Sequence, residues 1–293
     1  MQNLVVGATG VLGGKICQSL RDAGESVRAL VRTTSSPEAV ERLTAMGAEI
    51  VVGDVKSPES LRAACHGVDT VFFTASAIGA PKEGDSFDTV DLDGVRHLID
   101  AAKAEGVKRI VYISVLGIAG DFPMGRAKVE SERALRESGI PYTILQSAVF
   151  MDSWLAPEMG FDYASGNVTV LGDGSTRQGW IHSTDVARVA VSAARSDAAA
   201  NQVLHVTGPA SLTMVEVVRT FEEVAGRPFE ASFVPREALD GQRAGATNPW
   251  EETFAALGQR FAEGDPADVQ PLPAGVDAPT ITMADFARQL LGA

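Results

Sequence analysis

Three glycines near the N-terminus have the spacing of a turn that binds a pyrophosphate. They are Gly7, Gly10 and Gly13, between an apolar run at 4–6 and an amphipathic stretch at 15–23. The first glycine permits a tight turn, the second lets the backbone approach a phosphate, and the third lets a helix pack on a strand. Free amides at the helix N-terminus would then face the phosphates. The pattern favours a dinucleotide-binding turn over the alternative, a glycine-rich turn without a ligand.

Arg32 ends the second predicted strand, 26–32, at the place that selects between the two pyridine dinucleotides. A carboxylate there binds a free ribose 2'-hydroxyl, whereas a cation binds a 2'-phosphate. Three hydroxyl donors follow, Thr33, Thr34 and Ser35. The strand end therefore favours NADP(H) over NAD(H). The alternative is that Arg32 is an ordinary solvated charge.

Composition indicates a globular protein with a sizeable core. The chain has 293 residues, of which 45% are hydrophobic, and a formal net charge of −13. Such a charge argues against nucleic-acid and anionic-membrane partners and favours a small-molecule ligand. The two cysteines, Cys17 and Cys65, lack metal-type spacing and are expected as reduced thiols, without a metal site. A strand begins within three residues of the N-terminus, and no apolar run is long enough to span a bilayer, so we expect a cytoplasmic protein.

Short apolar runs alternate with helical patterns through the first half of the chain. Strands are predicted at 4–6, 26–32, 49–52, 70–73, 109–114 and 141–146. Helices are predicted at 15–23, 37–46, 57–64, 91–105 and 128–138. This alternation predicts an α/β fold with right-handed crossovers, in which a doubly wound (Rossmann), mainly parallel sheet binds ligands beyond the carboxyl ends of its strands.

The second half is less regular. Its predicted elements are strands at 168–171 and 203–206 and helices at 183–194, 213–225 and 283–291. We expect a dinucleotide-binding domain at 1–150, to which 180–206 return, and a small C-terminal α/β substrate lobe from 151–179 and 207–293. The segment 234–279 is rich in Ala, Gly and Pro. It is either a mobile lid over a pocket or a loosely packed part of the lobe.

Motifs over residues 1–225 resemble the NmrA-like branch of the atypical short-chain dehydrogenase/reductases in order and spacing. Besides the glycine turn, they are Val31-Arg32, Gly53-Asp54-Val55, Asp91-Leu92-Asp93-Gly94-Val95, Tyr112-Ile113-Ser114, Lys128-Val129-Glu130-Ser131-Glu132, Gln146-Ser147-Ala148-Val149-Phe150-Met151, Ile181-His182-Ser183-Thr184-Asp185-Val186-Ala187 and His205-Val206-Thr207-Gly208-Pro209. The resemblance implies three sets of residues around NADP(H). Those at the pyrophosphate are Gly7, Thr9, Gly10, Val11, Leu12 and Gly13. Those at the adenosine end are Arg32 on the 2'-phosphate, Asp54 and Val55 at the adenine, and Thr74 and Ala75 beside the ribose. Those at the nicotinamide are Lys128, Ala148, Val149 and Phe150.

Met124 is where the chain departs from the wider superfamily. Those enzymes usually carry a tyrosine four residues before the lysine, because a carbonyl that accepts a hydride also needs a proton. A methionine thioether cannot donate one. Lys128 and Ser114 remain as catalytic candidates, and His182 is a less favoured candidate for the proton donor. The alternative for Lys128 is a solvated cation one helical turn from Glu132.

The missing acid favours substrates that delocalise the charge they receive. The first expectation is an NADPH-dependent reductase of an aromatic, polyketide-like ketone or of a quinone, with the proton taken from water or substrate. Tyrosine-lacking ketoreductases of the simocyclinone type, which tailor aromatic polyketides in antibiotic biosynthesis, are similar in this respect. Simple quinone reductases of the NmrA-like branch are the runner-up. The alternatives are a non-catalytic NADP(H)-binding redox sensor or regulator and, less favoured, an epimerase or dehydratase.

Apolar and aromatic residues of the middle segment form a candidate substrate pocket. They are Met124, Phe150, Trp154 and Tyr163, with Met151 and Met159 nearby; an ordinary core cluster is the alternative. Substrate identity, the stereochemistry of hydride transfer and the oligomeric state do not follow from the residues, although a monomer is compatible with them.

Overall fold

A seven-stranded parallel sheet forms the centre of the molecule. The computed structural model describes residues 1–79, 81–266 and 269–292. The sheet contains β1 (Gln2–Val6), β2 (Ser26–Val31), β3 (Glu49–Val52), β4 (Thr70–Phe73), β5 (Arg109–Val115), β6 (Tyr142–Ser147) and β10 (Gln202–Val206). Their order is β10-β6-β5-β4-β1-β2-β3, and every neighbouring pair is parallel. The predicted doubly wound fold is confirmed.

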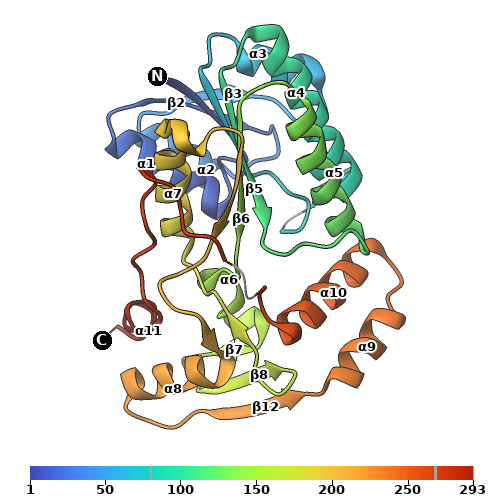
Figure 1. The fold of residues 1–293 in the computed structure, drawn as a ribbon, viewed down its shortest axis with the longest axis vertical. Helices are drawn as coiled ribbons and strands as arrows, with labels where there is room; N and C mark the ends of the chain where they lie inside the picture. Colours follow the sequence, from blue (N-terminus) through green and yellow to red (C-terminus); the bar gives the residue numbers. More distant parts are fainter. Residues whose placement is uncertain (80, 267–268, 293) are drawn as a thin grey trace.

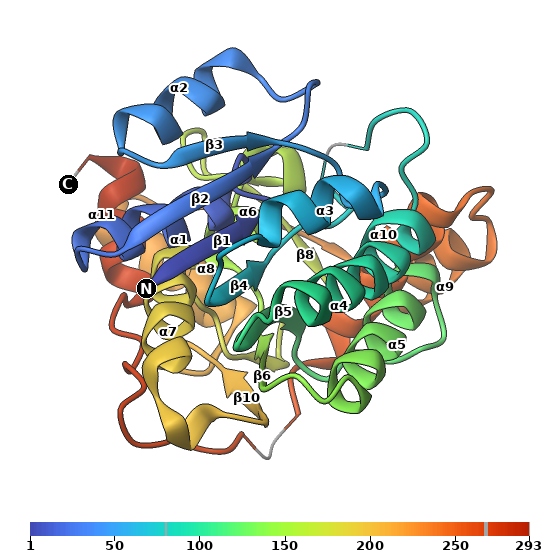
Figure 2. The ribbon, with the colours of Figure 1, turned by 90° about the horizontal axis from the view of Figure 1, so that it is seen from above.

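Helices cover both faces of this sheet (Figures 1 and 2). One face carries α1 (Val11–Asp22), α2 (Pro37–Ala45) and α7 (Ser183–Arg195), and the other carries α3 (Pro58–Cys65), α4 (Asp93–Glu105) and α5 (Pro123–Glu137). Successive strand residues serve opposite faces: Val5 packs with the first group, whereas Leu4 and Val6 pack with the second. The strand order reverses between β1 and β4, the place where ligands bind in such sheets.

A smaller lobe lies beyond the carboxyl ends of the central strands (Figure 1). Its three-stranded sheet contains β7 (Phe161–Asp162), β8 (Asn167–Leu171) and β12 (Glu230–Val234), and β9 (Arg177–Gln178) pairs with β11 (Leu212–Thr213). Its helices are α6 (Met151–Trp154), α8 (Met214–Ala225), α9 (Arg236–Ala244), α10 (Pro249–Glu263) and α11 (Met283–Leu291). Single 3-10 turns lie at Pro157–Met159 and Asp197–Ala199. Between the lobe segments the chain returns to the large sheet, where α7 packs on α1 and β10 pairs with β6.

Several predicted boundaries were wrong, each for a local reason. Helix α5 begins at Pro123 rather than at 128, because proline is well suited to a first helical position. Helix α1 begins at Val11, directly after the glycine turn. The helix predicted from 91 is preceded by a π-helical turn, η1 (Phe87–Leu92), and α4 starts only at Asp93.

The segment 234–279 is more regular than its composition indicated. It holds two full helices, α9 and α10, apart from residues 267–268, which lie outside the described residues. Helix α9 buries only one side chain, Leu239, so its sequence lacks a run of apolar residues that would mark a core-facing helix. Helix α10 packs on α9 and α5 and buries mainly small residues. The composition of this segment did not indicate these two helices.

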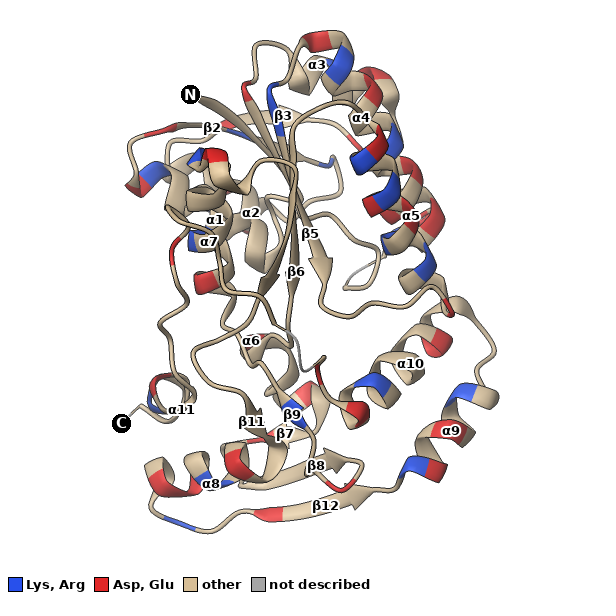
Figure 3. Cartoon of the chain, viewed as in Figure 1, with Lys and Arg blue, Asp and Glu red and all other residues tan. Residues whose placement is uncertain are grey.

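Burial and charge follow the layers. Both cysteines are buried free thiols, and burial raises the pKa of each to about 12, which keeps Cys17 and Cys65 protonated. Charged residues are concentrated in the helices and turns, and few lie in the central strands (Figure 3). None of the helices in the described ranges combines the length and apolar character needed to cross a membrane.

Adjacent glycines in α1 provide a test of the first crossover. A Cβ at Gly13 would overlap the carbonyl of Gly7, whereas a Cβ at Gly14 would lie 3.6 Å from the Ala8 oxygen. We expect Gly13→Ala to lower the free energy of unfolding by about 1–3 kcal/mol through overpacking. Gly14→Ala should raise it by about 0.5–1 kcal/mol, because alanine is the better helix former. Urea unfolding measures both, and equal effects would contradict the assigned close packing.

Candidate functional site

The glycine turn is built to leave room for a ligand beside the backbone. Gly7 has a φ of +88°, and a Cβ there would lie 2.6 Å from Thr74 Oγ1. The Thr74 hydroxyl donates to the Val6 carbonyl at 3.1 Å, which ties the ends of β1 and β4 together. Gly10 caps α1 without a side-chain hydrogen bond. The first-turn amides of α1, residues 11–13, have no acceptor among the described residues, so they are available to a pyrophosphate.

A cavity of about 280 Å³ opens at the carboxyl ends of β2 and β3. Arg32 and Asp54, which the sequence assigned to the adenosine end, both line it. The other lining residues are Thr33, Thr34, Val52, Gly53, Lys56, Ser57, Ser60, Lys82 and Glu83. Ser60 fixes the loop after β3, because its hydroxyl accepts from the Asp54 N–H at 3.0 Å and donates to the Asp54 carbonyl at 2.9 Å. Two of the five predicted adenosine residues, Arg32 and Asp54, therefore share one cavity, whereas Val55, Thr74 and Ala75 do not line it.

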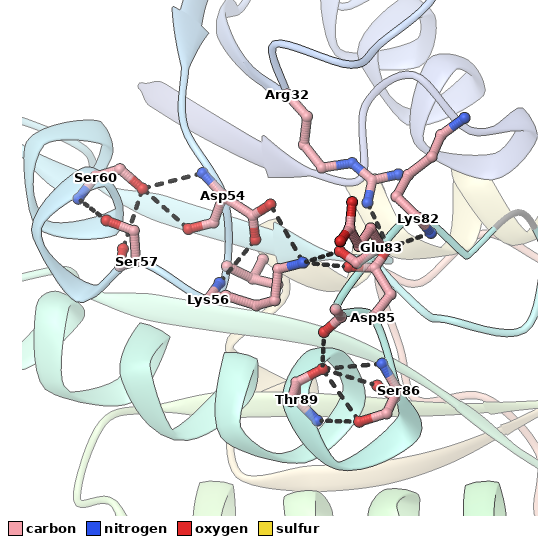
Figure 4. Close-up of polar contacts among 12 residues, drawn as sticks. Arg32, Asp54, Lys56, Ser57, Ser60, Lys82, Glu83, Asp85, Ser86 and Thr89 are labelled. Carbon is pink, nitrogen blue, oxygen red and sulfur yellow. Dashed lines mark hydrogen bonds and ion pairs between the residues drawn. The ribbon is translucent and has the colours of Figure 1, made fainter. Parts of the chain in front are cut away.

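Asp85, which sequence reasoning missed, joins the cations of this cavity (Figure 4). Its Oδ2 lies 2.7 Å from Arg32 Nη1, and its Oδ1 lies 2.5 Å from Lys56 Nζ. Its side chain is only 3% exposed, and it also accepts from the Lys82 N–H at 2.9 Å. Burial alone would raise the pKa of Asp85, but the hydrogen bonds from Lys56, the Lys82 amide and Arg32 hold that pKa below its usual value. The carboxylate is thus ionised at neutral pH.

Lys128 is buried and paired with a second carboxylate. Its Nζ lies 3.4 Å from Asp91 Oδ1, donates to the Ile113 carbonyl at 3.3 Å and sits 4.9 Å from the centre of the Tyr112 ring. Asp91 is fully buried on η1, and its Oδ2 accepts from the Ala77 N–H at 2.9 Å. Lys128, at 6% exposed, is therefore not the solvated cation of the alternative interpretation.

The surroundings of Lys128 keep its charge. Burial alone would lower the pKa of the ammonium, but Tyr112 and the Asp91 carboxylate together raise that pKa above its usual value. Burial also raises the pKa of the Tyr112 phenol, and Asp91 adds to this while Lys128 opposes it. The Tyr112 hydroxyl is buried without a hydrogen-bond partner in the described structure. At neutral pH the cluster is an ion pair beside a neutral phenol.

Ser114 and Met124 are held within the fold. The Ser114 hydroxyl donates to Glu132 Oε1 at 2.6 Å, and the Gln146 amide donates to the same carboxylate. Met124, 3% exposed, lies in the first turn of α5, and its N–H donates to Thr253 Oγ1 of α10 at 3.4 Å. The predicted catalytic roles of Ser114 and Lys128 stay predictions. Met124 is covered from the side of α10.

The remaining candidate pocket residues lie in the lobe or at its junction with the sheet. Phe150 forms a backbone bridge with Ile181, next to Ala148, whose N–H donates to the Val206 carbonyl. Trp154 stacks on Phe261 with ring centres 4.7 Å apart, in the lobe core against which Tyr163 also packs. The structure thus places Trp154 and Tyr163 in one cluster and Met124 in another.

The His182 side chain caps the N-terminus of α7. Its Nδ1 accepts from the Thr184 N–H at 3.2 Å, and its ring packs on Phe286. Burial lowers the pKa of His182, and Lys15 adds to this while Asp152 opposes it. The His182 ring is therefore mainly neutral at pH 7, and its role as a proton donor stays a prediction.

Comparison with known proteins places the chain in a family. Residues 2–268 match the model of the NmrA-like family. The chain is 31% identical over 291 residues to the NAD(P)H azoreductase of Xenophilus azovorans, covering 97% of this chain and 96% of that protein. It is 29% identical over 242 residues to the photosystem II assembly factor Ycf39 of Cyanophora paradoxa, covering 82% and 74%. The NADPH complex of the quinone oxidoreductase QOR2 of Escherichia coli has a similar fold, with a TM-score of 0.79, 22% identity and 99% coverage of both chains. The protein belongs to the NmrA-like family.

The Lys128–Asp91 pair can be tested as a double-mutant cycle. Removing either partner leaves a buried charge unpaired, and we expect Lys128→Met or Asp91→Asn to lower the free energy of unfolding by about 3–5 kcal/mol. The double variant should lose clearly less than the sum of the singles. Urea unfolding of the four proteins provides the measurement. Additive losses would contradict a direct ion pair.

The burial of His182 predicts a dependence of stability on pH. The folded-state pKa of His182 lies below its unfolded-state value, so the contribution of His182 to the free energy of unfolding is complete above about pH 6.5. That contribution is lost as the pH falls, because the unfolded chain takes up the proton first. We expect the free energy of unfolding to drop between pH 7 and 5 less steeply in His182→Asn, since asparagine also caps helices well. Parallel slopes in the two proteins would refute this assignment.

Proposed function

We propose that the protein is an NADPH-dependent oxidoreductase that reduces quinones and related conjugated aromatic carbonyl compounds. The observation that carries the proposal is the buried Lys128–Asp91 pair, which α5 and η1 hold against the parallel sheet that also carries the glycine turn, with Met124 at the position of the usual proton donor. The names of two similar proteins, the azoreductase and the quinone oxidoreductase, support a reductase.

The residues of the site fit NADP(H). Gly7 and Gly13 allow the backbone of the turn to pack closely on itself and on the end of β4, and free amides of α1 suit the pyrophosphate. Arg32 and Lys56 on the cavity after β2 and β3 suit a 2'-phosphate. When bound, this coenzyme supplies a hydride.

Lys128 holds positive charge where a reduced oxygen needs it. Asp91 keeps the lysine protonated, so the ammonium stabilises negative charge in the transition state without giving up a proton. A quinone that has received a hydride becomes a hydroquinone anion, whose charge spreads over the ring, and one proton from water completes the product. Simple ketones yield a localised alkoxide and need an acid at the same moment. Met124 cannot supply it.

Two kinds of substrate fit this chemistry. One is an aromatic ketone flanked by a phenol, as in polyketide-like molecules, and the other is a quinone. In the first, the neighbouring hydroxyl of the substrate supplies the proton. In the second, no internal donor is needed. The apolar residues at Phe150 and Trp154 suit either flat ring system.

A second candidate is a coenzyme-binding protein without catalysis. The missing tyrosine and the similarity to an assembly factor favour it. Such a protein would retain NADPH but would not consume it when an acceptor is added.

Steady-state consumption of NADPH tests the proposal. We expect turnover with a benzoquinone or naphthoquinone and none with an aliphatic ketone. Lys128→Met should lower kcat/KM by about a hundredfold, the order lost with a single charge-stabilising group. Lys103→Met, the same substitution at an exposed position of α4, is the matched control and should leave kcat/KM unchanged. Binding of NADPH without consumption, for any of these acceptors, would favour the second candidate.

A further inference from the structure

The charges around the adenosine cavity are arranged in two layers. Arg32, Lys56 and Lys82 line the cavity, whereas Asp85 does not line it and has a side chain only 3% exposed. Asp85 lies behind the first two cations and bonds both of them, one through each carboxylate oxygen (Figure 4). A buried carboxylate with this geometry fixes two long, flexible side chains at one wall of the cavity.

The position of Asp85 is set by the backbone around it. Its Oδ2 accepts from the Lys82 N–H at 2.9 Å, and its own N–H donates to the Lys82 carbonyl at 2.9 Å. The next residue, Ser86, starts η1 with a reciprocal cap: its hydroxyl accepts from the Thr89 N–H, and its N–H donates to Thr89 Oγ1. The carboxylate is therefore held in place independently of the two cations that it binds.

The two cations keep donors for a ligand. An arginine has five N–H donors and a lysine three, and each uses one on Asp85. Lys56 Nζ also lies 3.4 Å from the Glu83 carbonyl and 3.9 Å from Asp54 Oδ2; the second contact is an ion pair too long for a hydrogen bond, so one of the three donors makes no hydrogen bond among the described residues. The Arg32 side chain is 36% exposed and the Lys56 side chain 29% exposed, so both can be reached from the cavity.

We propose that Asp85 is a positioning residue for coenzyme selection, which orients Arg32 and Lys56 so that both donate to the 2'-phosphate of NADPH. Lys56 is then a second ligand of that phosphate beside Arg32. This inference rests on the proposed function, since it assigns the 2'-phosphate to this cavity. Because the side chains are ordered before the ligand arrives, less conformational entropy is lost on binding.

Adenosine 2',5'-bisphosphate and adenosine 5'-monophosphate test the inference without the nicotinamide. In calorimetric titrations, Asp85→Asn should weaken binding of the bisphosphate about tenfold, the scale typical of residues that orient a ligand-binding group. Binding of the monophosphate should not change. Lys56→Met should show the same selective loss, and Asp85→Glu should restore part of it. Asp88→Asn, the same change at an exposed position of η1, is the matched control and should behave as the wild type.

The alternatives give different results. Tighter binding of the bisphosphate by Asp85→Asn would show that the carboxylate competes with the phosphate and would overturn the inference. An equal loss for both nucleotides would show a structural role only and would also overturn it. If Asp85→Asn does not fold, Lys56→Met provides the test. An unchanged preference of Lys56→Met for the bisphosphate over the monophosphate would also overturn the inference. A wild-type chain that prefers neither nucleotide would refute the NADPH assignment and this inference together. Selective binding without NADPH consumption would refute the reductase alone.

Discussion

The site depends on an ion pair that the fold keeps away from water. Burying an ammonium and a carboxylate costs several kcal/mol each in principle, and the pair persists only when both are well bonded. Asp91 meets this condition through one oxygen, Oδ2, which accepts from the Ala77 amide, whereas its Oδ1 has no hydrogen-bond partner in the described structure and lies 3.4 Å from the Lys128 ammonium. Lys128 also donates to the Ile113 carbonyl. The result is a fixed positive charge, and under the proposed function this charge stabilises the reduced substrate without donating a proton.

One short helix positions both charged clusters. Asp85 immediately precedes the Ser86 cap of η1, and Asp91 lies near the end of η1. A π-helical turn is wider than an α-helical one and is frequent at functional sites. Here it directs Asp91 inward to Lys128, while the chain just before it holds Arg32 and Lys56. The adenosine and lysine ends of the site are therefore connected through a single element.

Much of the fold follows from the sequence, because strand and helix periodicities and caps are local signals. Ser36, directly before the predicted helix at 37–46, accepts from the Ala39 N–H in the structure, and Thr213, where the predicted helix at 213–225 begins, is the N-cap of α8. The resemblance placed Arg32 and Asp54 together at the adenosine end, which is consistent with parallel strands whose carboxyl ends meet at one edge. The structure gives both a common cavity.

The charge partners were not predictable in the same way. Arg32 and Asp85 are 53 residues apart, and Asp85 lies in a loop without periodicity. Tyr112 is buried in β5, and its position under Lys128 depends on α5 and β5 packing together. The two helices of 234–263 were not predicted from the sequence; α9, for example, buries only Leu239. Such features arise from tertiary contacts rather than from neighbours in the chain.

Kinetic isotope effects on quinone reduction test the central claim most directly, that hydride transfer proceeds here without a protein acid. With NADPH deuterated at the transferred position of C4, the account predicts a primary isotope effect on kcat/KM. With deuterated water it predicts a solvent isotope effect near unity, because the proton arrives after the hydride. A large solvent effect on the same step would contradict the account, as would the absence of any NADPH oxidation.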